Sequence, residues 1–427
     1  MKPWSLRLFA CLALILLFTT SAVHAQEGIE QISFKGLKKT RISFVQRFLR
    51  SKAGGEYDAA LVAGDEQSIR NLQLFSSVSS RVEQQDGKTT LVFDVEELVT
   101  RLPITNFGGI TDNFWLQLGI NDFNWLGRGG YFGGYYQYYD RHSFKVFSLM
   151  PYLFSDRLGL SYIAGRQSTR EPAYFSDTSL DFDVDRWELT GMIRYEIYRN
   201  LATQNLWTLD AGGGYLNEIY TLPSTATIDF PRRTQFDKIF LKATVAHSKI
   251  NYFYHHVDGG SQQSTLELVR TINDDIAFWK WFNEFRFFRH IGANANPALR
   301  IVAGISSNDD TPFVPFVLDS YLNVRGSGNR VARGTSELTF NIEHRQTLRE
   351  KKTWAFEGVV FLDLSAWRPG NGPLLEMFER ENIVSFAGAG ARLHLRRIYN
   401  FSLRLDYGIS TSDPSSRGFV LGVGQYF

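Results

Sequence analysis

The sequence predicts a mainly β protein: a 16-stranded transmembrane antiparallel β-barrel preceded by one small β-α-α-β-β domain. Segments of alternating apolar and polar residues run from Arg101 to the end of the chain, and aromatic residues make up 15% of it. The apolar runs after Gln26 are all shorter than a transmembrane helix requires. The net charge of +2, from 46 basic and 44 acidic residues, is too balanced to suggest a nucleic-acid-binding protein.

Residues 1–25 have the organisation of a signal peptide. Lys2 and Arg7 form a positive start, residues 8–20 are apolar, and Val23-His24-Ala25 is a small-x-small cleavage pattern. An N-terminal anchor helix is the alternative, but the apolar run is short for a bilayer span. The single cysteine of the chain, Cys11, lies in this segment, so we expect a mature protein without disulfide bonds.

Residues 27–99 predict a small soluble α+β domain with its own core. Thr40 and Asp58 are expected N-caps of two helices, and Asp86-Gly87 is a hairpin signal. The expected elements are a strand over 29–34, helices over 40–49 and after Asp58, and strands over 78–84 and 89–96.

Residues 101–427 predict the barrel. In one segment Leu403, Leu405 and Tyr407 alternate with Arg404 and Asp406. A soluble sandwich and a membrane barrel both produce this alternation, but strands of about ten residues and unequal connections at the two ends favour the barrel. The expected short turns are 155–157 and 397–400, and the expected long loops are 168–184, 220–236, 309–334 and 366–382.

Four motifs carry a resemblance to a known family: the turn 124–129 (NWLGRG), Val324-Arg325-Gly326, Phe361-Leu362-Asp363 and the ending 422–427 (GVGQYF). With the signal peptide, the small domain and the barrel, they make the chain similar to the outer-membrane assembly and secretion superfamily of BamA, TamA and the two-partner secretion transporters. The resemblance implies a bacterial surface antigen barrel in the outer membrane and a POTRA domain, residues 27–99, in the periplasm.

The middle two motifs predict a contact inside the barrel. Val360 and Leu362 share the lipid-facing parity of their strand, so Phe361 and Asp363 are expected to point into the lumen. The residues alone leave two interpretations of Arg325 open: a solvated loop arginine, or the partner of Asp363. The resemblance implies the second, a structural latch made by Arg325, Gly326, Phe361 and Asp363. Ser327 stands where the family has an aromatic residue.

The first and last barrel strands are expected to meet at a weak lateral seam, because proline lacks a ladder donor and glycine loses more entropy on ordering. The residues concerned are Pro103, Gly108, Gly109, Gly422 and Gly424. The terminal Phe427 is expected to be an aromatic anchor of the last strand and the C-terminal assembly signal.

The chain contains no HExxH, Walker, CxxC or GxSxG pattern, so we expect no enzyme activity and no cofactor. His255-His256 lies in an expected turn, and because adjacent strand residues point to opposite faces we expect no metal site there.

The expected function is assembly, insertion or translocation of proteins at the outer membrane. A two-partner-type secretion pore or a passive surface barrel or anchor is the alternative. The family's assembly factors and secretion transporters carry more than one POTRA domain, whereas this chain has one. The expected partners are outer-membrane lipid and an unfolded or secreted client polypeptide, with periplasmic chaperones or accessory lipoproteins as further candidates and no nucleic acid.

Overall fold

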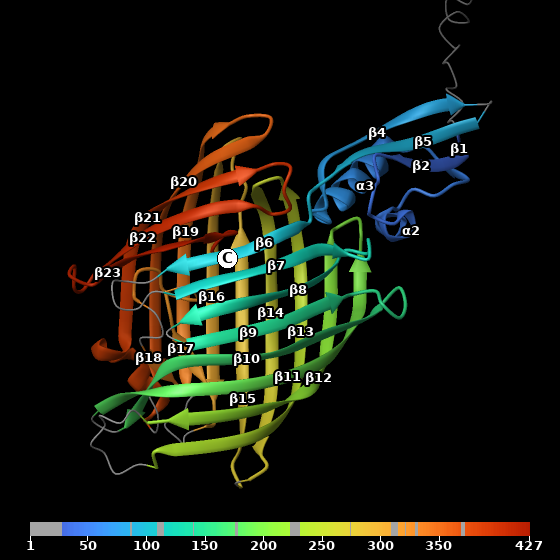
Figure 1. Cartoon of the computed structure of the whole chain (residues 1–427). Coiled ribbons are helices and arrows are strands. Elements are labelled where there is room, and N and C mark those ends of the chain that lie inside the picture. The colour runs from blue at the N-terminus through green and yellow to red at the C-terminus, as the bar shows by residue number, and fades with distance from the viewer. Residues whose placement is uncertain are drawn as a thin grey trace, which may run out of the picture.

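A POTRA-like domain sits at one mouth of a closed barrel in the computed structural model (Figure 1). The signal segment, the hairpin turn Asp86-Gly87 and Gly109 lie outside the residues that the structure describes. The described residues are 28–85, 88–108, 115–139, 141–175, 178–222, 231–273, 275–308, 315–320, 322–328, 332–368 and 372–427.

The small domain has the predicted β-α-α-β-β elements around one core, with an additional short two-stranded sheet of β1 and β3 that was not predicted. Its elements are β1 (Gly28–Ile29), β2 (Gln31–Lys35), α2 (Ile42–Val45), η1 (Gln46–Phe48), β3 (Gly55–Glu56), α3 (Ala59–Asn71), β4 (Phe75–Gln85) and β5 (Lys88–Glu97). The sheet order is β2-β5-β4, with β2 parallel to β5. Val45, Ile69 and Phe93 are fully buried between helices and sheet. No helix in the described part of the chain is long and apolar enough to cross a membrane.

Of the two predicted helix caps, one is confirmed and one is wrong. The Asp58 side chain accepts hydrogen bonds from the backbone N–H groups of Ala60 and Leu61 at 2.8 and 3.2 Å. The first helix instead begins after Arg41, which makes no side-chain cap. Thr40 is used differently, because its hydroxyl accepts a hydrogen bond from Asn124 of the barrel.

In the described residues, 16 strands form a closed antiparallel barrel, which confirms the predicted fold class. They are β6 (Arg101–Gly108), β7 (Trp115–Trp125), β8 (Gly130–Tyr139), β9 (Arg141–Met150), β10 (Leu158–Phe175), β11 (Thr178–Asn200), β12 (Asn205–Thr221), β13 (Arg233–Phe253), β14 (His256–Thr271), β15 (Ala277–Phe288), β16 (Ala295–Ser306), β19 (Ser336–Glu350), β20 (Trp354–Arg368), β21 (Ile383–Leu395), β22 (Ser402–Ser410) and β23 (Arg417–Val423). Each strand neighbours the next along the chain, and β23 closes on β6.

The two faces of the barrel wall follow the predicted alternation. On β22, Leu405 and Tyr407 are 47% and 43% exposed on the outside, whereas Asp406 is fully buried on the inside. On β20, Val360 and Leu362 face outward and Asp363 is buried. An apolar outer surface around a polar interior is the arrangement that a lipid bilayer requires.

One predicted loop is wrong. Residues 168–184 are not a loop, because β10 and β11 stay paired up to Phe175 and Thr178. Polar residues suggested a loop there, but the strands continue beyond the alternating pattern. Phe182 and Val184 are buried with Tyr220 of β12, so this extension has an apolar cluster of its own.

The predicted connections 309–334 and 366–382 do contain the longer excursions. The first carries the two-stranded sheet of β17 (Phe316–Leu318) and β18 (Ala332–Gly334), and the second carries η2 (Leu374–Phe378) and η3 (Arg380–Asn382). Between β12 and β13 the connection is shorter than the predicted 220–236, since β12 ends at Thr221 and β13 begins at Arg233.

The turn 124–129 joins the small domain to the barrel mouth. The Asn124 side chain donates to Thr40 Oγ1 at 2.8 Å, and the Gly127 carbonyl accepts from the Arg41 N–H at 2.9 Å. Gly127 has a φ of +70°, and a Cβ there would lie 2.2 Å from the Lys39 carbonyl oxygen. The turn therefore needs glycine both for its backbone conformation and for close contact with the domain.

Candidate functional site: the lumen cluster and the β6–β23 seam

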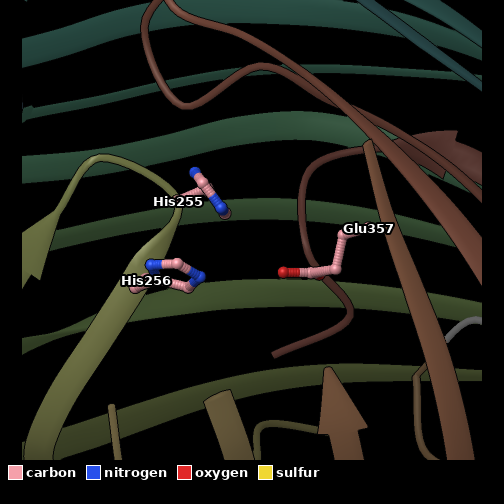
Figure 2. A group of neighbouring side chains, drawn as sticks. All are labelled: His255, His256 and Glu357. Carbon is pink, nitrogen blue, oxygen red and sulfur yellow. The ribbon is translucent and has the colours of Figure 1, made fainter. Parts of the chain in front are cut away.

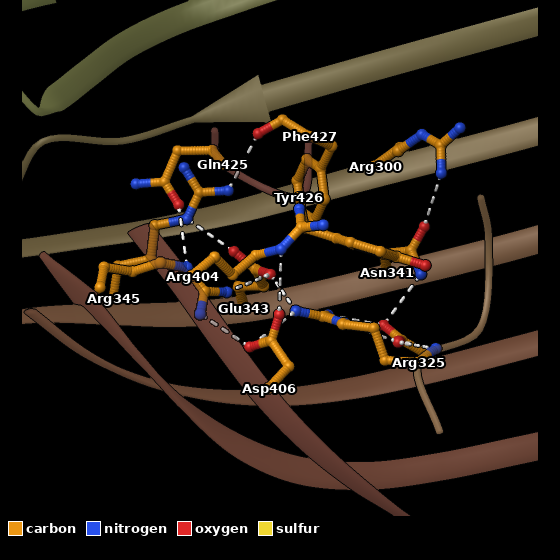
Figure 3. Close-up of polar contacts among 12 residues, drawn as sticks. Arg300, Arg325, Asn341, Glu343, Arg345, Arg404, Asp406, Gln425, Tyr426 and Phe427 are labelled. Carbon is orange, nitrogen blue, oxygen red and sulfur yellow. Dashed lines mark hydrogen bonds and ion pairs between the residues drawn. The ribbon is translucent and has the colours of Figure 1, made fainter. Parts of the chain in front are cut away.

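Arg325 is the centre of a buried ionic cluster in the lumen (Figure 3). Its Nε and Nη2 donate to Asp363 Oδ2 and Oδ1 at 2.9 and 2.8 Å, and its backbone N–H donates to Asp363 Oδ2 at 3.0 Å. Both side chains have 0% exposure. The structure therefore brings together the two charges that the motifs carry, in the two-pronged geometry that only a guanidinium provides.

Two aromatic rings enclose the Arg325 guanidinium. Its carbon lies 3.7 Å from the ring centre of Phe361 and 4.2 Å from that of Tyr426. Burial by itself would lower the pKa of Arg325, but the negative charges of Glu343 and Asp363 raise it above its usual value. Arg325 therefore stays charged, hydrogen-bonded to the carboxylates and in cation–π contact with the two rings.

Further charged groups of the lumen surround this pair. Arg325 Nη1 also donates to Glu343, which accepts from Arg345 Nε at 2.6 Å. Asp406 lies 2.8 Å from Arg392 Nη1 and 3.9 Å from Arg325 Nη1. All of these side chains are almost fully buried. Arg325 thus ties its loop to strands β19, β20 and β22, and Asp406 extends the cluster to Arg392 of β21.

Glycines allow the tip of this loop to approach the wall. Gly326 has a φ of +90°, and a Cβ on it would lie 2.7 Å from the Gly408 carbonyl oxygen. Conversely, a Cβ on Gly408 of β22 would lie 2.3 Å from the Arg325 carbonyl oxygen. Backbone therefore packs directly on backbone here, and the latch role predicted for Gly326 depends on an opposing glycine.

The β6–β23 seam is short. Its described residue pairs are Val420↔Gly108 and Leu421↔Phe107, whereas β22 and β23 share seven pairs. Gly422 and Gly424 follow directly on the β23 side, where Gly424 has a φ of +100° and the chain leaves the sheet. The Val423 N–H donates to the Asn106 side chain at 3.3 Å instead of to a ladder carbonyl. Pro103 lies on β6 beyond the last described pair, opposite Ile120 of β7.

The expectation that Phe427 anchors the last strand is wrong in its geometry. Because β23 ends at Val423, the last residues turn into the lumen, and Phe427 is 8% exposed. Its ring packs 6.2 Å from that of Phe288 and 5.1 Å from the Arg345 guanidinium carbon. Arg345 Nη2 also donates to the Phe427 main-chain oxygen at 3.1 Å.

Deleting Phe427 is expected to reduce the amount of barrel assembled in the outer membrane several-fold. The deletion removes the packing on Phe288 and the acceptor of Arg345, which leaves buried groups without partners. The measurement is the heat-modifiable band in the membrane fraction. Phe419→Ala is the control, since this aromatic lies on β23 with 44% exposure. An unchanged membrane yield after the deletion would show that Phe427 is not part of the assembly signal.

The geometric premise for rejecting a metal at His255-His256 is also wrong. His255 lies in the turn before β14, so the two side chains are not held on opposite faces of a strand. Their Nε2 atoms lie 2.8 and 2.9 Å from one hydroxyl oxygen, that of Thr347 on β19. Both imidazole rings therefore point toward the Thr347 hydroxyl group.

Sequence reasoning missed most of the cluster around the Arg325–Asp363 pair. Glu343 and Asp406 occupy inward positions of alternating strands, so strand parity could have identified them as lumen charges. Tyr426 carried no such signal, because only the turn at Gly424 brings its ring over Arg325.

Comparison with known proteins agrees with this architecture. The model of the "Omp85 superfamily domain" matches residues 124–427. The POTRA model, described as "Surface antigen variable number repeat", matches residues 28–98. A comparison with curated protein sequences gives no match.

Solved structures of similar fold include BamA from Haemophilus ducreyi lacking POTRA domains 1–3, with a TM-score of 0.54 and 14% identity over 93% of this chain and 84% of that chain. CdiB from Escherichia coli has a TM-score of 0.61 and 12% identity, over 93% of this chain and 76% of that chain. CdiB from Acinetobacter baumannii has a TM-score of 0.59 and 13% identity, over 93% and 74%. Since the superfamily model covers more than half of the sequence, the chain belongs to the Omp85 superfamily, as an outer-membrane β-barrel with a periplasmic POTRA domain.

Proposed function

We propose that this barrel inserts client β-strands into the outer membrane at the seam between β6 and β23. Membership of the Omp85 superfamily gives the general function, assembly or translocation of proteins at the outer membrane. The observation that carries the more specific proposal is an open strand edge. In the described residues, 101–106 of β6 pair with β7 but have no ladder partner on the β23 side.

Such an edge can bind an incoming strand. Unpaired backbone N–H and C=O groups template another strand by β-augmentation. Parting the described pairs at Phe107 and Gly108 would lengthen the edge toward the other side of the membrane. The process requires no nucleotide, because burial of the client's apolar face in lipid supplies the driving force.

The POTRA domain supports the proposal with a second edge. Its sheet order, β2-β5-β4, leaves β2 and β4 at the sides of the sheet. An unfolded client in the periplasm could add to one of these strands before it reaches the barrel. The contact of Asn124 with Thr40 holds the domain against the mouth where β6 begins.

The alternatives are a two-partner-type secretion pore and a passive barrel or anchor. The loop around Arg325 and the three residues from Gln425 to Phe427 lie inside the lumen. Because these side chains occupy the lumen, they favour a route for the client polypeptide through the side wall over a route along the barrel axis.

A disulfide across the seam is the experiment that tests the proposal. Gly108 and Val420 are directly opposed in the register, so Gly108→Cys with Val420→Cys sets two cysteines opposite each other across the seam. The locked protein, reconstituted in liposomes, is expected to lose its acceleration of the folding of a urea-unfolded eight-stranded barrel. Reductant is expected to restore the rate, and heat-modifiable mobility of the client is the readout.

The control lock joins strands that the proposal leaves together. Thr244 and Thr265 are opposed on β13 and β14, with their hydroxyl oxygens 2.8 Å apart. Thr244→Cys with Thr265→Cys is expected to leave client folding unchanged. Equal rates for the oxidised and reduced seam mutant would overturn the proposal and favour a route through the lumen.

A further inference from the structure

Half of the histidines of the chain meet at the periplasmic mouth of the barrel. Of its eight histidines, His255, His256, His290 and His394 form one cluster of contacting rings. Ring centres lie 4.0 Å apart for His255 and His256, 5.0 Å for His255 and His394, and 4.4 Å for His256 and His290. His255, His256 and His394 are at most 6% exposed. Neither the latch nor the seam uses these residues.

A buried carboxylate faces the two adjacent histidines. Glu357 of β20 has 0% exposure, and its side chain points across the lumen toward His255 and His256 (Figure 2). Ligand atoms of these three residues all lie within 4.8 Å of one another. Glu357 Oε1 is 3.4 Å from Gln425 Nε2 and 3.6 Å from His394 Nε2.

Several polar atoms of the group are unsatisfied. In the described residues, Glu357 Oε2, His255 Nδ1 and His394 Nε2 are buried without a hydrogen-bond partner. Buried polar atoms without partners are costly, and a buried carboxylate requires a positive charge. The long contacts of Glu357 with Gln425 and His394 do not supply a full positive charge.

The residue types of this group are those that bind metals. Two imidazoles with a carboxylate are a donor set for borderline divalent ions, and a dication would also neutralise the charge of Glu357.

We propose that His255, His256 and Glu357 bind a divalent transition-metal ion of the zinc class, with His394 placed as the fourth ligand. Tetrahedral zinc would draw the ligand atoms to about 3.4 Å from one another, so these side chains would rotate toward the ion on binding. The ion would tie the turn before β14 to β20 and β21 across the mouth. A cavity of about 760 Å³ gives the hydrated ion access to the site. It is lined by His255, His256 and His394, and by Arg70 and Gln73 of the POTRA domain.

The test is metal binding by the full-length protein without a histidine tag. Chelator-stripped protein in detergent is expected to bind one Zn²⁺ per chain, measured by equilibrium dialysis and elemental mass spectrometry. Co²⁺ is expected to give the intense absorption of tetrahedral coordination. His256→Ala and Glu357→Gln are each expected to weaken Zn²⁺ binding at least about 100-fold, beyond the change typical of outer-shell residues.

His247→Ala is the matched control, since His247 Nε2 contacts Asn205 outside the cluster at 2.8 Å. This variant is expected to bind Zn²⁺ as the unaltered protein does. Loss of binding in the control, or unaltered protein that takes up no stoichiometric Zn²⁺ and shows only octahedral Co²⁺, would overturn the proposal. The unaltered protein decides the question even where a variant fails to fold.

Discussion

Arg325→Ala is expected to lower the free energy of unfolding by about 3–5 kcal/mol, the typical cost of breaking a buried ion pair. The substitution leaves the Asp363 and Glu343 carboxylates without their shared cation, at 0% exposure. Asp363→Ala is expected to cost less, because Arg325 keeps Glu343 and the rings of Phe361 and Tyr426. Urea titration of the barrel in lipid vesicles measures the free energy of unfolding of both variants.

The double mutant distinguishes a latch from two separate charges. Arg325→Ala with Asp363→Ala is expected to be more stable than the sum of the single changes predicts, because removing the second partner relieves a buried unpaired charge. Arg325→Lys should rescue only partly, since an ammonium cannot donate from Nε and Nη2 to the two Asp363 oxygens together.

An exposed ion pair is the control for this cycle. Arg270 and Asp275 lie 3.6 Å apart with side chains 69% and 99% exposed. Their coupling is expected to be at most about 1 kcal/mol, as for other surface pairs. A coupling energy below about 0.5 kcal/mol between Arg325 and Asp363 would mean that the two changes are additive, and it would contradict the latch.

Gly408→Ala is expected to destabilise the inward loop by about 1–3 kcal/mol, the usual cost of overpacking. The new Cβ would lie 2.3 Å from the Arg325 carbonyl oxygen, so the loop tip has to move. That movement pulls the Arg325 N–H away from Asp363, which accepts from it at 3.0 Å. Faster cleavage of the loop by added protease, together with a lower free energy of unfolding, is the measurement.

Gly191→Ala separates this contact from the general effect of changing a strand glycine. A Cβ on Gly191 of β11 would meet no atom within 4 Å. Its neighbours on the same face, Leu189 and Ile193, are 61% and 43% exposed. The variant is expected to change stability by less than about 0.5 kcal/mol. Equal effects of the two alanines would show that the approach of the loop to β22 contributes nothing.

The barrel could be predicted from the sequence because strand parity is a local property. Alternation along β22 places Leu405 and Asp406 on opposite faces without knowledge of any other strand, and strand length and unequal connections then favour the barrel, which turns the apolar face outward. Asp58 likewise caps its helix through contacts two and three residues away. The partnership of Arg325 with Asp363 is not local, and only the family resemblance gave a reason to expect it.

The contacts that only the tertiary structure decided depend on the places where the chain turns into the lumen. Gly424 turns the last residues off β23, so Phe427 packs in the lumen instead of anchoring a strand, and Tyr426 covers Arg325. The turn before β14 likewise aims His255 and His256 at one point near Glu357, a residue about a hundred positions away. Residue alternation specifies the face of a strand but not its neighbours around a closed barrel. The contacts across the lumen follow from closure, which sets the distance between strands far apart in sequence.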